Sequence, residues 1–329
     1  MKEKKIVSVV IPAFNCEKTI SKTIQSVLVQ SYGNLEIIIV DDGSTDSTAK
    51  IISGFKSVRY FYQKNSGPAS ARNAGAMKSK GGIVFFTDSD CIAHADWIET
   101  AMKCFNDEVA VVAGSYGIAN QESLLADCIF EEIKFRHTKL MPRFPKAFGS
   151  YNFGVKKNVF DEVGGFNSGY SSASGEDNDL SYKILKAGYK ILFEKNALVD
   201  HYHPDKFWKY MKEQFRHGYW RVKMYADHPK MAKGDDYTFW KDIVEIPIAF
   251  VSVVALIGSV LLGASFLQGS LFLMILLLAI ELVFALLIIK NIFGAIFMSF
   301  VMFFRSFSRM FGFMSGIFHF FLQNVHEKR

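Results

Sequence analysis

Short apolar runs alternate with amphipathic stretches along residues 1–241, a pattern typical of a soluble α/β protein. Runs such as residues 6–11 and 83–87 are apolar almost throughout, as expected of parallel strands that are buried on both faces of a sheet. Between the runs, residues 20–28 place their apolar side chains on one face of a helix. This alternation predicts βαβ units with right-handed crossovers. The expected fold class is therefore α/β with a mostly parallel sheet, whose first strands are residues 6–11, 35–40, 58–62 and 83–87.

A different pattern begins at residue 246. Over residues 246–289 the only ionisable side chain is Glu281, and this length allows two membrane spans of about 20 residues each. We expect the spans at about residues 246–266 and 271–289, joined by a polar link at residues 268–270. Glu281 is then either a functional residue inside the bilayer or a structural hydrogen-bond partner of a neighbouring helix.

The last segment, residues 291–322, is rich in Phe but is interrupted by Arg305 and Arg309. This composition favours interfacial or re-entrant helices, and a third span is the alternative. We therefore expect three parts of the chain: a catalytic domain over residues 1–225, a linker over residues 226–245 and an all-α membrane region over residues 246–329.

The N-terminal segment MKEKKIVSVVIPAFN is basic and then apolar, but its apolar run stops at Pro12 and is too short for the core of a signal peptide. With the N-terminal domain in the cytoplasm, Lys290 returns to the cytoplasmic side after the second span, in line with the positive-inside rule. We therefore expect an integral membrane protein whose catalytic domain lies on the cytoplasmic face. The four cysteines have no metal-ligand spacing and are expected to be ordinary thiols.

Polar segments follow the predicted strands at the ends where open α/β sheets bind ligands. These segments are residues 12–15, 41–46, 65–73 and 88–90. The topology gathers them at one rim of the sheet, which makes that rim the candidate site. Neither GxGxxG nor GxxxxGKS/T occurs in the chain, which argues against a dinucleotide-binding oxidoreductase and against a P-loop NTPase.

Asp88 and Asp90 come directly after the buried run that ends at Thr87. Two carboxylates this close repel each other and lose solvent near a sheet edge, so keeping both ionised is costly. A divalent cation would remove that cost, and hard carboxylate oxygens suit Mg²⁺ or Mn²⁺. A metal with few protein ligands is commonly shared with a diphosphate, whose charge it neutralises.

Five motifs occur in a fixed order along the chain: VSVVIPAFN, VDDGSTD, NSGPASARNAG, TDSD and GEDNDL. Each motif is short, but the ordered set, over about residues 6–220, resembles the family 2 glycosyltransferases of the GT-A fold. The resemblance implies a metal-dependent glycosyltransferase of the hexosyltransferase type. It also implies a nucleotide-sugar donor, with UDP as the default nucleotide, and Mg²⁺ or Mn²⁺ as the cofactor.

The resemblance also assigns roles to individual residues. Contacts to the nucleotide-sugar fall to Pro12, Ala13, Phe14, Asp41, Asp42, Arg72 and Asp88, and metal contacts fall to Asp90 and Asp88. Asp177, or alternatively Glu176, is the expected general base that takes the proton from an acceptor hydroxyl in a direct displacement with inversion. A metal stabilises the leaving diphosphate, so no general acid is needed. The competing interpretation of this acidic pair is an ordinary cluster at a helix N-terminus.

The sequence QFRHGYW, residues 214–220, departs from the QxxRW sequence that this family often carries, because no Arg-Trp pair follows the glutamine. Processive polymer synthesis is therefore not expected. Arg216 is interpreted as a contact of the diphosphate or of the lipid surface. His201 and His203 follow a predicted strand, and His203 is a further candidate metal ligand, the alternative being a structural role for both.

The leading hypothesis is a membrane-anchored inverting glycosyltransferase that moves a sugar from a nucleotide-sugar to a hydroxyl of a lipid-linked or membrane-proximal saccharide. A polyprenyl-phosphate glycosyltransferase is the alternative; its phosphate acceptor needs no base, and a basic pocket near Arg136, Arg143 or Arg216 would favour it. An inactive transferase-like membrane scaffold is an alternative of another class. The expected partners are the donor, the acceptor and membrane lipids, and no nucleic acid.

Overall fold

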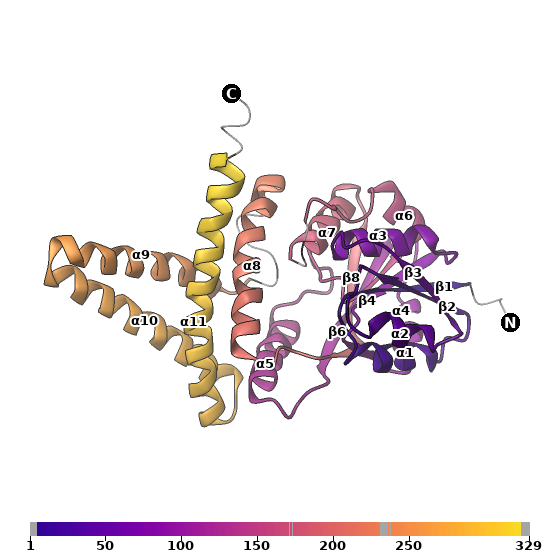
Figure 1. Cartoon of the computed structure of the whole chain (residues 1–329), viewed down its shortest axis with the longest axis horizontal. Helices are drawn as coiled ribbons and strands as arrows, with labels where there is room; N and C mark the ends of the chain where they lie inside the picture. Colours follow the sequence, from indigo (N-terminus) through magenta and orange to yellow (C-terminus); the bar gives the residue numbers. More distant parts are fainter. Residues whose placement is uncertain (1–4, 171, 173, 231–235, 237, 324–329) are drawn as a thin grey trace. The chain divides into compact units, whose positions relative to one another are not determined.

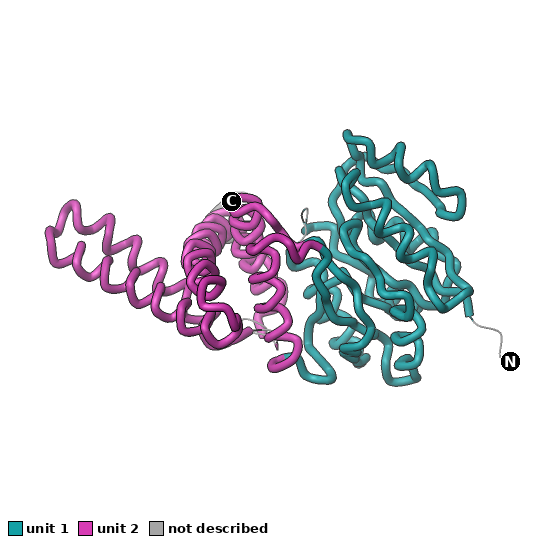
Figure 2. Tube along the Cα trace, turned by 90° about the horizontal axis from the view of Figure 1, so that it is seen from below, with its two compact units in different colours: residues 1–119, 141–202 teal, residues 120–140, 203–329 magenta. Residues whose placement is uncertain are grey.

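The computed structural model describes residues 5–323 apart from residues 171, 173, 231–235 and 237. The chain forms two compact units, which Figure 2 draws in different colours. Residues 1–119 and 141–202 make the first unit, and residues 120–140 and 203–329 make the second. Residues 120–140, from within the predicted catalytic domain, therefore belong with the C-terminal helices.

An eight-stranded sheet forms the centre of the first unit, in the order β3-β2-β1-β4-β7-β6-β8-β5 (Figure 1). Its strands are β1 (Val7–Ala13), β2 (Leu35–Asp41), β3 (Val58–Tyr62), β4 (Ile83–Thr87), β5 (Cys91–Ala93), β6 (Val109–Ile118), β7 (Asn152–Lys156) and β8 (Lys190–His201). β1 to β4 pair in parallel, as do β6 and β8, whereas β7 is antiparallel to both neighbours and β5 is antiparallel to β8. The predicted mostly parallel sheet is confirmed.

Helices cover both faces of this sheet. One face carries α1 (Ile20–Leu28), α2 (Thr48–Ser53) and α4 (Trp97–Met102), and the other carries α3 (Pro68–Lys78), α6 (Lys157–Glu162) and α7 (Glu176–Lys186) (Figure 1). Successive strand residues point to opposite faces. Phe85 therefore packs against Trp97 in one core, and Phe86 packs against Phe160 in the other.

The strand ends bring distant segments together at one rim of the sheet. β1 and β2 are parallel and end side by side, with Ala13 opposite Asp41. β7 is antiparallel to β4, and Thr87 at the end of β4 pairs with Asn152 at the start of β7. The residues after β4 and the residues before β7 consequently meet at this rim, a meeting that the apolar pattern alone did not predict.

The second unit is built from helices. They are α5 (Leu124–Lys139), α8 (Phe207–Asp227), α9 (Trp240–Leu262), α10 (Ala264–Ile288) and α11 (Ile292–Ile317), and a short π-helix, η2 (Phe318–Gln323), continues α11. Three stretches, Trp240–Leu262, Ala264–Ile288 and Ile292–Phe320, are long and apolar enough to cross a membrane, by length and composition alone. They fit the predicted membrane anchoring.

The hairpin of α9 and α10 turns at Gly263 rather than at the predicted link, residues 268–270. Gly263 has a φ of +87°, which a residue with a side chain adopts only under strain. Residues 268–270 lie inside α10, where Ser270 Oγ donates to Ser252 O at 2.8 Å. The Ser270 hydroxyl of this segment therefore makes a hydrogen bond between the two helices, and the segment does not form the turn.

Candidate active site

The loops that follow β1 and β2 are fastened to each other at the rim. Asn15 has a φ of +47°, and its Oδ1 accepts a hydrogen bond from Thr45 N at 2.8 Å. Among the predicted nucleotide contacts, Ala13 is buried, Pro12 is half-buried and Phe14 is 50% exposed. Phe14 is therefore the residue of this group whose side chain is most open to a ligand.

Asp41 and Asp42 are both buried and both engaged by the protein itself. Asp41 accepts from Tyr60 Oη at 2.9 Å, and burial together with this hydrogen bond raises the pKa of Tyr60 to about 12. Asp42 accepts from Ser66 N at 2.8 Å and from Gly67 N at 2.9 Å. Asp42 thereby orders the turn that leads into α3, and both carboxylates shape the rim.

Arg72, in α3, joins two carboxylates from distant parts of the chain. Its Nη2 lies 2.7 Å from Asp88 Oδ1, and its Nη1 lies 3.0 Å from Glu176 Oε1. The Arg72 side chain is only 4% exposed. Although burial opposes it, the charges of Asp88 and Glu176 raise the pKa of Arg72, so this guanidinium stays positive. Arg72 therefore neutralises part of a carboxylate-rich site.

Glu176 and Asp177 are adjacent at the start of α7 but have different surroundings. Glu176 is 2% exposed, and its Oε2 accepts from Ser174 N at 2.8 Å in addition to the Arg72 contact. Asp177 is only partly buried, and its Oδ1 accepts from Asn178 N at 2.9 Å. Burial raises the pKa of both carboxyl groups, and the Arg72 guanidinium opposes the rise at both. Asp177 is thus the less buried of the two carboxyl groups of raised pKa.

The loop before β7 passes close to Asp177 at Gly149. A Cβ on Gly149 would lie 3.5 Å from Asp177 Oδ2 and 2.5 Å from the ring of Tyr151, so a larger residue would displace that ring. Tyr151 stacks on Tyr116 with ring centroids 3.4 Å apart, and the Tyr116 ring lies 5.1 Å from the ring of His201. An aromatic pair therefore connects the Asp177 end of the site to the His201 end. No motif in the sequence marked these two tyrosines or Gly149.

Asp90, Cys91 and His201 form a group that could hold a metal ion, with one ligand atom of each lying within 4.8 Å of the others. His201 Nε2 lies 3.3 Å from Asp90 Oδ1, because Cys91 in β5 pairs with His201 at the end of β8. Burial raises the pKa of the Cys91 thiol well above its ordinary value, which makes its thiolate unfavourable. The carboxylate and the imidazole are the donors that fit a divalent cation.

Two predicted site residues belong to the second unit. His203 is 4% exposed, and its backbone N–H donates to Asn120 Oδ1 at 3.0 Å. Among the described residues, the group that could hold a metal contains His201 and not His203. Arg216 lies on α8, so its contact with a diphosphate or with lipid stays a prediction.

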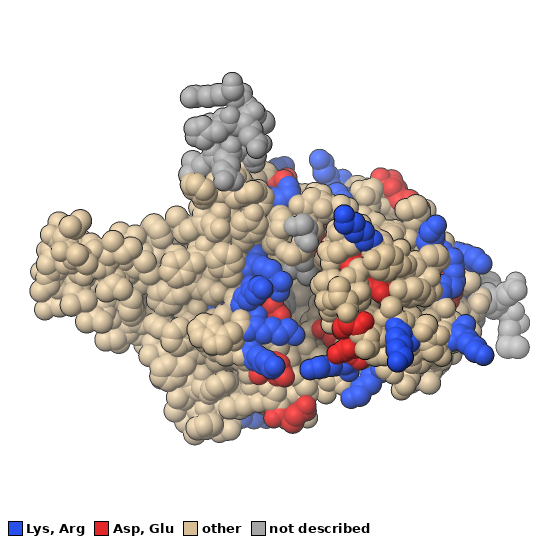
Figure 3. All heavy atoms as spheres, in the orientation of Figure 1, with Lys and Arg blue, Asp and Glu red and all other residues tan. Residues whose placement is uncertain are grey.

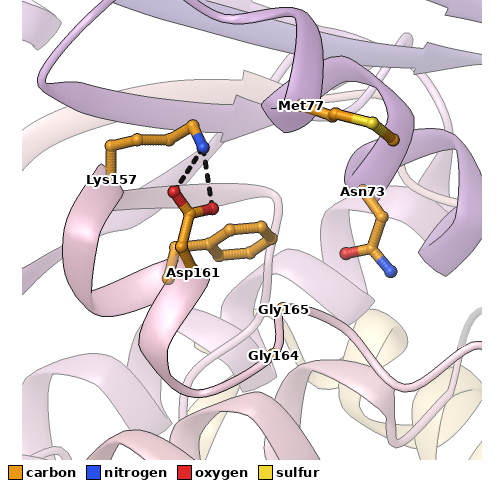
Figure 4. A pocket seen from close by; sticks show the side chains of 7 residues that line it. Asn73, Met77, Lys157, Asp161, Gly164 and Gly165 are labelled. Carbon is orange, nitrogen blue, oxygen red and sulfur yellow. Dashed lines mark hydrogen bonds and ion pairs between the residues drawn. The ribbon is translucent and has the colours of Figure 1, made fainter.

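A separate pocket of about 350 Å³ lies between α3 and α6 of the first unit (Figure 4). It is lined by Asn73, Met77, Lys157, Phe160, Asp161, Gly164 and Gly165. Its charged residues, Lys157 and Asp161, pair with each other at 2.6 Å, and Asn73 Nδ2 donates to Phe166 O at 2.8 Å. This pocket contains none of the predicted site residues, and its polar groups are already paired, so the rim of the sheet is the candidate active site.

The chain is similar to a family model and to curated glycosyltransferases. The family model described as Glycosyl transferase family 2 matches residues 8–166. Glycosyltransferase GlyG of Streptococcus pneumoniae serotype 4 is 32% identical over 212 residues, which cover 59% of this chain and 69% of GlyG. The chain belongs to glycosyltransferase family 2. This membership confirms the resemblance drawn from the five ordered motifs.

Other relatives of this family 2 glycosyltransferase differ in length. The glucosyl-dolichyl phosphate glucuronosyltransferase of Haloferax volcanii is 27% identical over 262 residues, which cover 72% of this chain and 83% of the relative. Glycosyltransferase GlyA of Streptococcus pneumoniae and three uncharacterized glycosyltransferases of Rickettsia species are much longer proteins, and the chain spans between 14% and 30% of their lengths.

Among solved structures, the glycosyltransferase aligns with the mannosyltransferase PcManGT from Pyrobaculum calidifontis in complex with GDP-Man and Mn²⁺. The TM-score is 0.62 at 17% identity, and the alignment covers 94% of this chain and 88% of PcManGT. At this identity the likeness shows the fold alone. It confirms the GT-A type of α/β fold for this glycosyltransferase.

Proposed function

We propose that this glycosyltransferase moves a sugar from a nucleoside-diphosphate sugar, with the help of a divalent cation, to a hydroxyl of a lipid-linked or membrane-proximal saccharide, with inversion. The observation that carries the proposal is Asp177, a half-buried carboxyl group of raised pKa at the start of α7. Its neighbour Glu176 is already paired with Arg72. An acceptor hydroxyl is a weak nucleophile until a base removes its proton, and Asp177 is suited to that task.

The reaction divides between Asp177 and its surroundings. Asp177 takes the proton of the acceptor hydroxyl as the acceptor oxygen forms its bond to the anomeric carbon. The bond from that carbon to the diphosphate breaks on the opposite face, and the diphosphate leaves with the bonding electrons. Arg72 pairs with Glu176 and with Asp88 and so fixes the positions of both carboxylates.

Asp90 and His201 are the residues that would hold the divalent cation, with Asp88 nearby in the chain. When bound, the cation supplies positive charge that stabilises the leaving diphosphate. The complex of PcManGT with GDP-Man and Mn²⁺ supports both a nucleotide-sugar donor and a divalent cation.

Two observations support a lipid-linked acceptor. The three helices that are long and apolar enough to cross a membrane would keep the enzyme beside such acceptors. The name of the Haloferax volcanii relative refers to a glucosyl-dolichyl phosphate, a sugar carried on a lipid phosphate. The position of Lys290 favours the cytoplasmic face for the catalytic domain.

The alternative acceptor, a bare polyprenyl phosphate, needs a cationic pocket rather than a base. Arg136 was one candidate for that pocket. Its guanidinium is buried and pairs with Glu132 at 2.7 Å and with Asp242 at 2.7 Å. Arg136 is therefore not open to a phosphate, so this residue gives the phosphate acceptor no support.

The experiment that tests the proposal is sugar transfer by Asp177→Asn in the full-length, detergent-purified protein. We expect kcat with a saccharide acceptor to fall by about 10²–10⁴-fold, the usual contribution of a general base, while donor binding is unchanged. Asp161→Asn is the matched control, because this carboxylate lies on α6, its side chain is 55% exposed, and it pairs with Lys157. The control should keep its activity.

Each remaining hypothesis has its own outcome. Full activity of a folded Asp177→Asn protein with a saccharide acceptor contradicts the base assignment. Transfer to polyprenyl phosphate that survives the substitution favours the phosphate acceptor. A calorimetric titration with UDP, GDP and dTDP, with and without Mn²⁺, assigns the donor nucleotide, and failure of a folded protein to bind any of them favours the inactive scaffold.

A further inference from the structure

α8 and the C-terminal half of α11 run side by side in the same direction (Figure 1). Near the start of the pair, the rings of Phe207 and Phe304 lie 5.8 Å apart. Near its end, the rings of Trp220 and Phe320 lie 5.7 Å apart. α8 therefore keeps one register against the chain from Phe304 of α11 to Phe320 of η2.

Glycines on α11 bring the two backbones into direct contact. A Cβ on Gly316 would lie 2.5 Å from Tyr219 O, and a Cβ on Gly312 would collide with Phe215 O. No layer of side chains separates the helices at these points. Wherever α11 lies in or on a membrane, α8 lies at nearly the same depth.

α8 is too polar for the hydrocarbon core of a bilayer. Its Lys, Arg, Asp and Glu residues that reach solvent are spread over the whole helix: Lys209, Lys212, Glu213, Arg216, Arg221, Lys223 and Asp227. Figure 3 shows basic side chains in a column over α8, whereas the face of the hairpin in the same view is free of charge. Because charges near the bilayer centre are costly, a helix locked beside α8 does not cross the hydrocarbon over this stretch.

The N-terminal half of α11 meets a second polar helix. Cys128 of α5 approaches Gly294 O at 3.7 Å through its Sγ, and Ile129 shares an apolar cluster with Ala295. α5 also carries Glu131 and Lys134, which pair with each other near solvent at 2.9 Å. Both halves of α11 are therefore bound to helices that need water on their other sides.

The hairpin of α9 and α10 runs across α11 rather than along it, and both views agree on this (Figures 1 and 2). Eight charged residues, which we call the junction cluster, hold the base of the hairpin against the middle of α11: Glu132, Arg136, Lys241, Asp242, Glu245, Glu281, Arg305 and Arg309. Beyond this cluster, residues 246–280 contain no ionisable side chain. The hairpin is therefore the part of the second unit that suits the hydrocarbon core.

We propose that α11 lies in the plane of the membrane interface, with one face on lipid, and that among the described helices only the α9–α10 hairpin enters the hydrocarbon. The lipid-facing stripe has helical spacing and consists of exposed apolar residues: Phe293, Ile296, Phe300, Phe304, Phe311, Met314 and Phe318. This stripe contacts lipid at the boundary between the headgroups and the acyl chains. The chain before α9 and the chain after α11 are consequently on the same side of the membrane.

The test measures the depth of fluorescent labels in vesicles that contain lipids brominated at known carbons. Single cysteines replace Ile296 and Met314 in the full-length protein. Across a spanning helix these positions differ in depth by about 27 Å, at 1.5 Å per residue, whereas in an in-plane helix they are at equal depth. Phe250 and Val260 on the hairpin form the matched pair, for which we expect a difference of about 15 Å.

Native thiols do not obscure this readout. Cys16 and Cys104 are half-buried and are replaced by serine, and Cys91 and Cys128 are buried. Equal quenching at residues 296 and 314, with graded quenching on the hairpin, supports the in-plane helix. A depth difference above about 15 Å between residues 296 and 314 overturns it. Absence of quenching at both positions also overturns it, because a protein partner would then cover the stripe.

A second measurement is independent of label depth. Topology reporters are fused to the N-terminus and, in a separate protein, to the C-terminus. The in-plane arrangement places both reporters on the same side of the membrane. Reporters on opposite sides show that α11 crosses the bilayer and contradict the proposal.

Discussion

Each unit buries a group of charged side chains, and the two groups are balanced differently. At the rim of the sheet, three carboxyl groups, those of Asp88, Glu176 and Asp177, surround the single guanidinium of Arg72. In the junction cluster, four acidic and four basic residues face one another: Glu132, Asp242, Glu245 and Glu281 against Arg136, Lys241, Arg305 and Arg309.

The difference teaches how to tell a reactive site from an architectural one in the same chain. In the unbalanced group, burial raises the pKa of both Glu176 and Asp177, and Asp177 is the less buried of the two. In the balanced cluster every carboxylate has a basic partner, and Lys241, Glu245 and Glu281 have no exposed surface; Arg309, with 24% of its side chain exposed, is the most open member. The group at the rim, with its excess of carboxyl groups, keeps one that can accept a proton in a reaction. The junction cluster, with equal numbers of acidic and basic residues, fixes the positions of helices.

The largest expected effect on stability comes from breaking the balanced cluster. Arg305→Met leaves Glu132 without its 2.6 Å partner and should lower the free energy of unfolding by about 3–5 kcal/mol, the usual result of removing one member of a buried ion pair. Although burial opposes it, Arg305 and Arg136 hold the pKa of Glu132 well below its ordinary value, so the loss should be greatest above the ordinary Glu pKa. Thermal unfolding in detergent micelles measures the loss. An unchanged midpoint would mean that the cluster does not hold the helices together.

The pH dependence of catalysis probes the unbalanced cluster. Asp177 accepts a proton only when it is ionised, and burial raises its pKa. We therefore expect kcat to fall about tenfold for each pH unit below this raised pKa and to level off above it. A profile of kcat against pH, at saturating donor and acceptor, measures this fall at acidic pH. A profile that stays flat down to about pH 4, the ordinary Asp pKa, would contradict the assignment.

The same group should make the folded state less stable at neutral pH. Because its folded-state pKa is raised, Asp177 binds its proton more tightly in the folded protein than in the unfolded chain. Stability therefore falls as pH rises from the ordinary Asp pKa through the raised value. Asp177→Asn removes this dependence, so the variant should unfold at a higher temperature than the parent at pH 8. The difference should vanish near pH 4.

The smallest effect is expected at a pair that belongs to neither cluster. Lys157 and Asp161 pair at 2.6 Å on the surface of α6, and exposed pairs of this kind contribute about 0–1 kcal/mol. Lys157→Met should leave both the unfolding midpoint and sugar transfer nearly unchanged. A large loss of transfer would instead show that the pocket of Figure 4 takes part in the reaction.

Much of the fold followed from the sequence because the signals were local. The apolar runs placed β1, β2, β3 and β4, and the polar segment after β4 placed Asp88 and Asp90 at the rim. Asp177 was assigned through the family resemblance. Tyr116, Gly149 and Tyr151 were missed, since they reach the site through the antiparallel strand β7, whose pairing depends on contacts far apart in the chain.

The remaining differences have the same physical origin. His201 and His203 are two residues apart, and only the register between β5 and β8 shows that His201 is the one beside Asp90. Lys241 was assigned to a linker, but it pairs with Glu281 at 2.9 Å from 40 positions earlier in the chain. Pairing partners at such separations leave no trace in local composition, so the sequence left the role of Glu281 open.

The charged contacts of the hairpin are confined to its base, so the rest of the hairpin can change more freely, both in evolution and in the laboratory. Residues 246–280 are free of ionisable groups, and the charges that hold the hairpin lie outside this stretch. The outer part of the hairpin is therefore an exchangeable module, in which length and apolar character matter more than identity. Lys241, Glu245 and Glu281 are the buried ion-pairing residues at the base of the hairpin. A foreign hairpin grafted onto this enzyme should need those three residues more than any others.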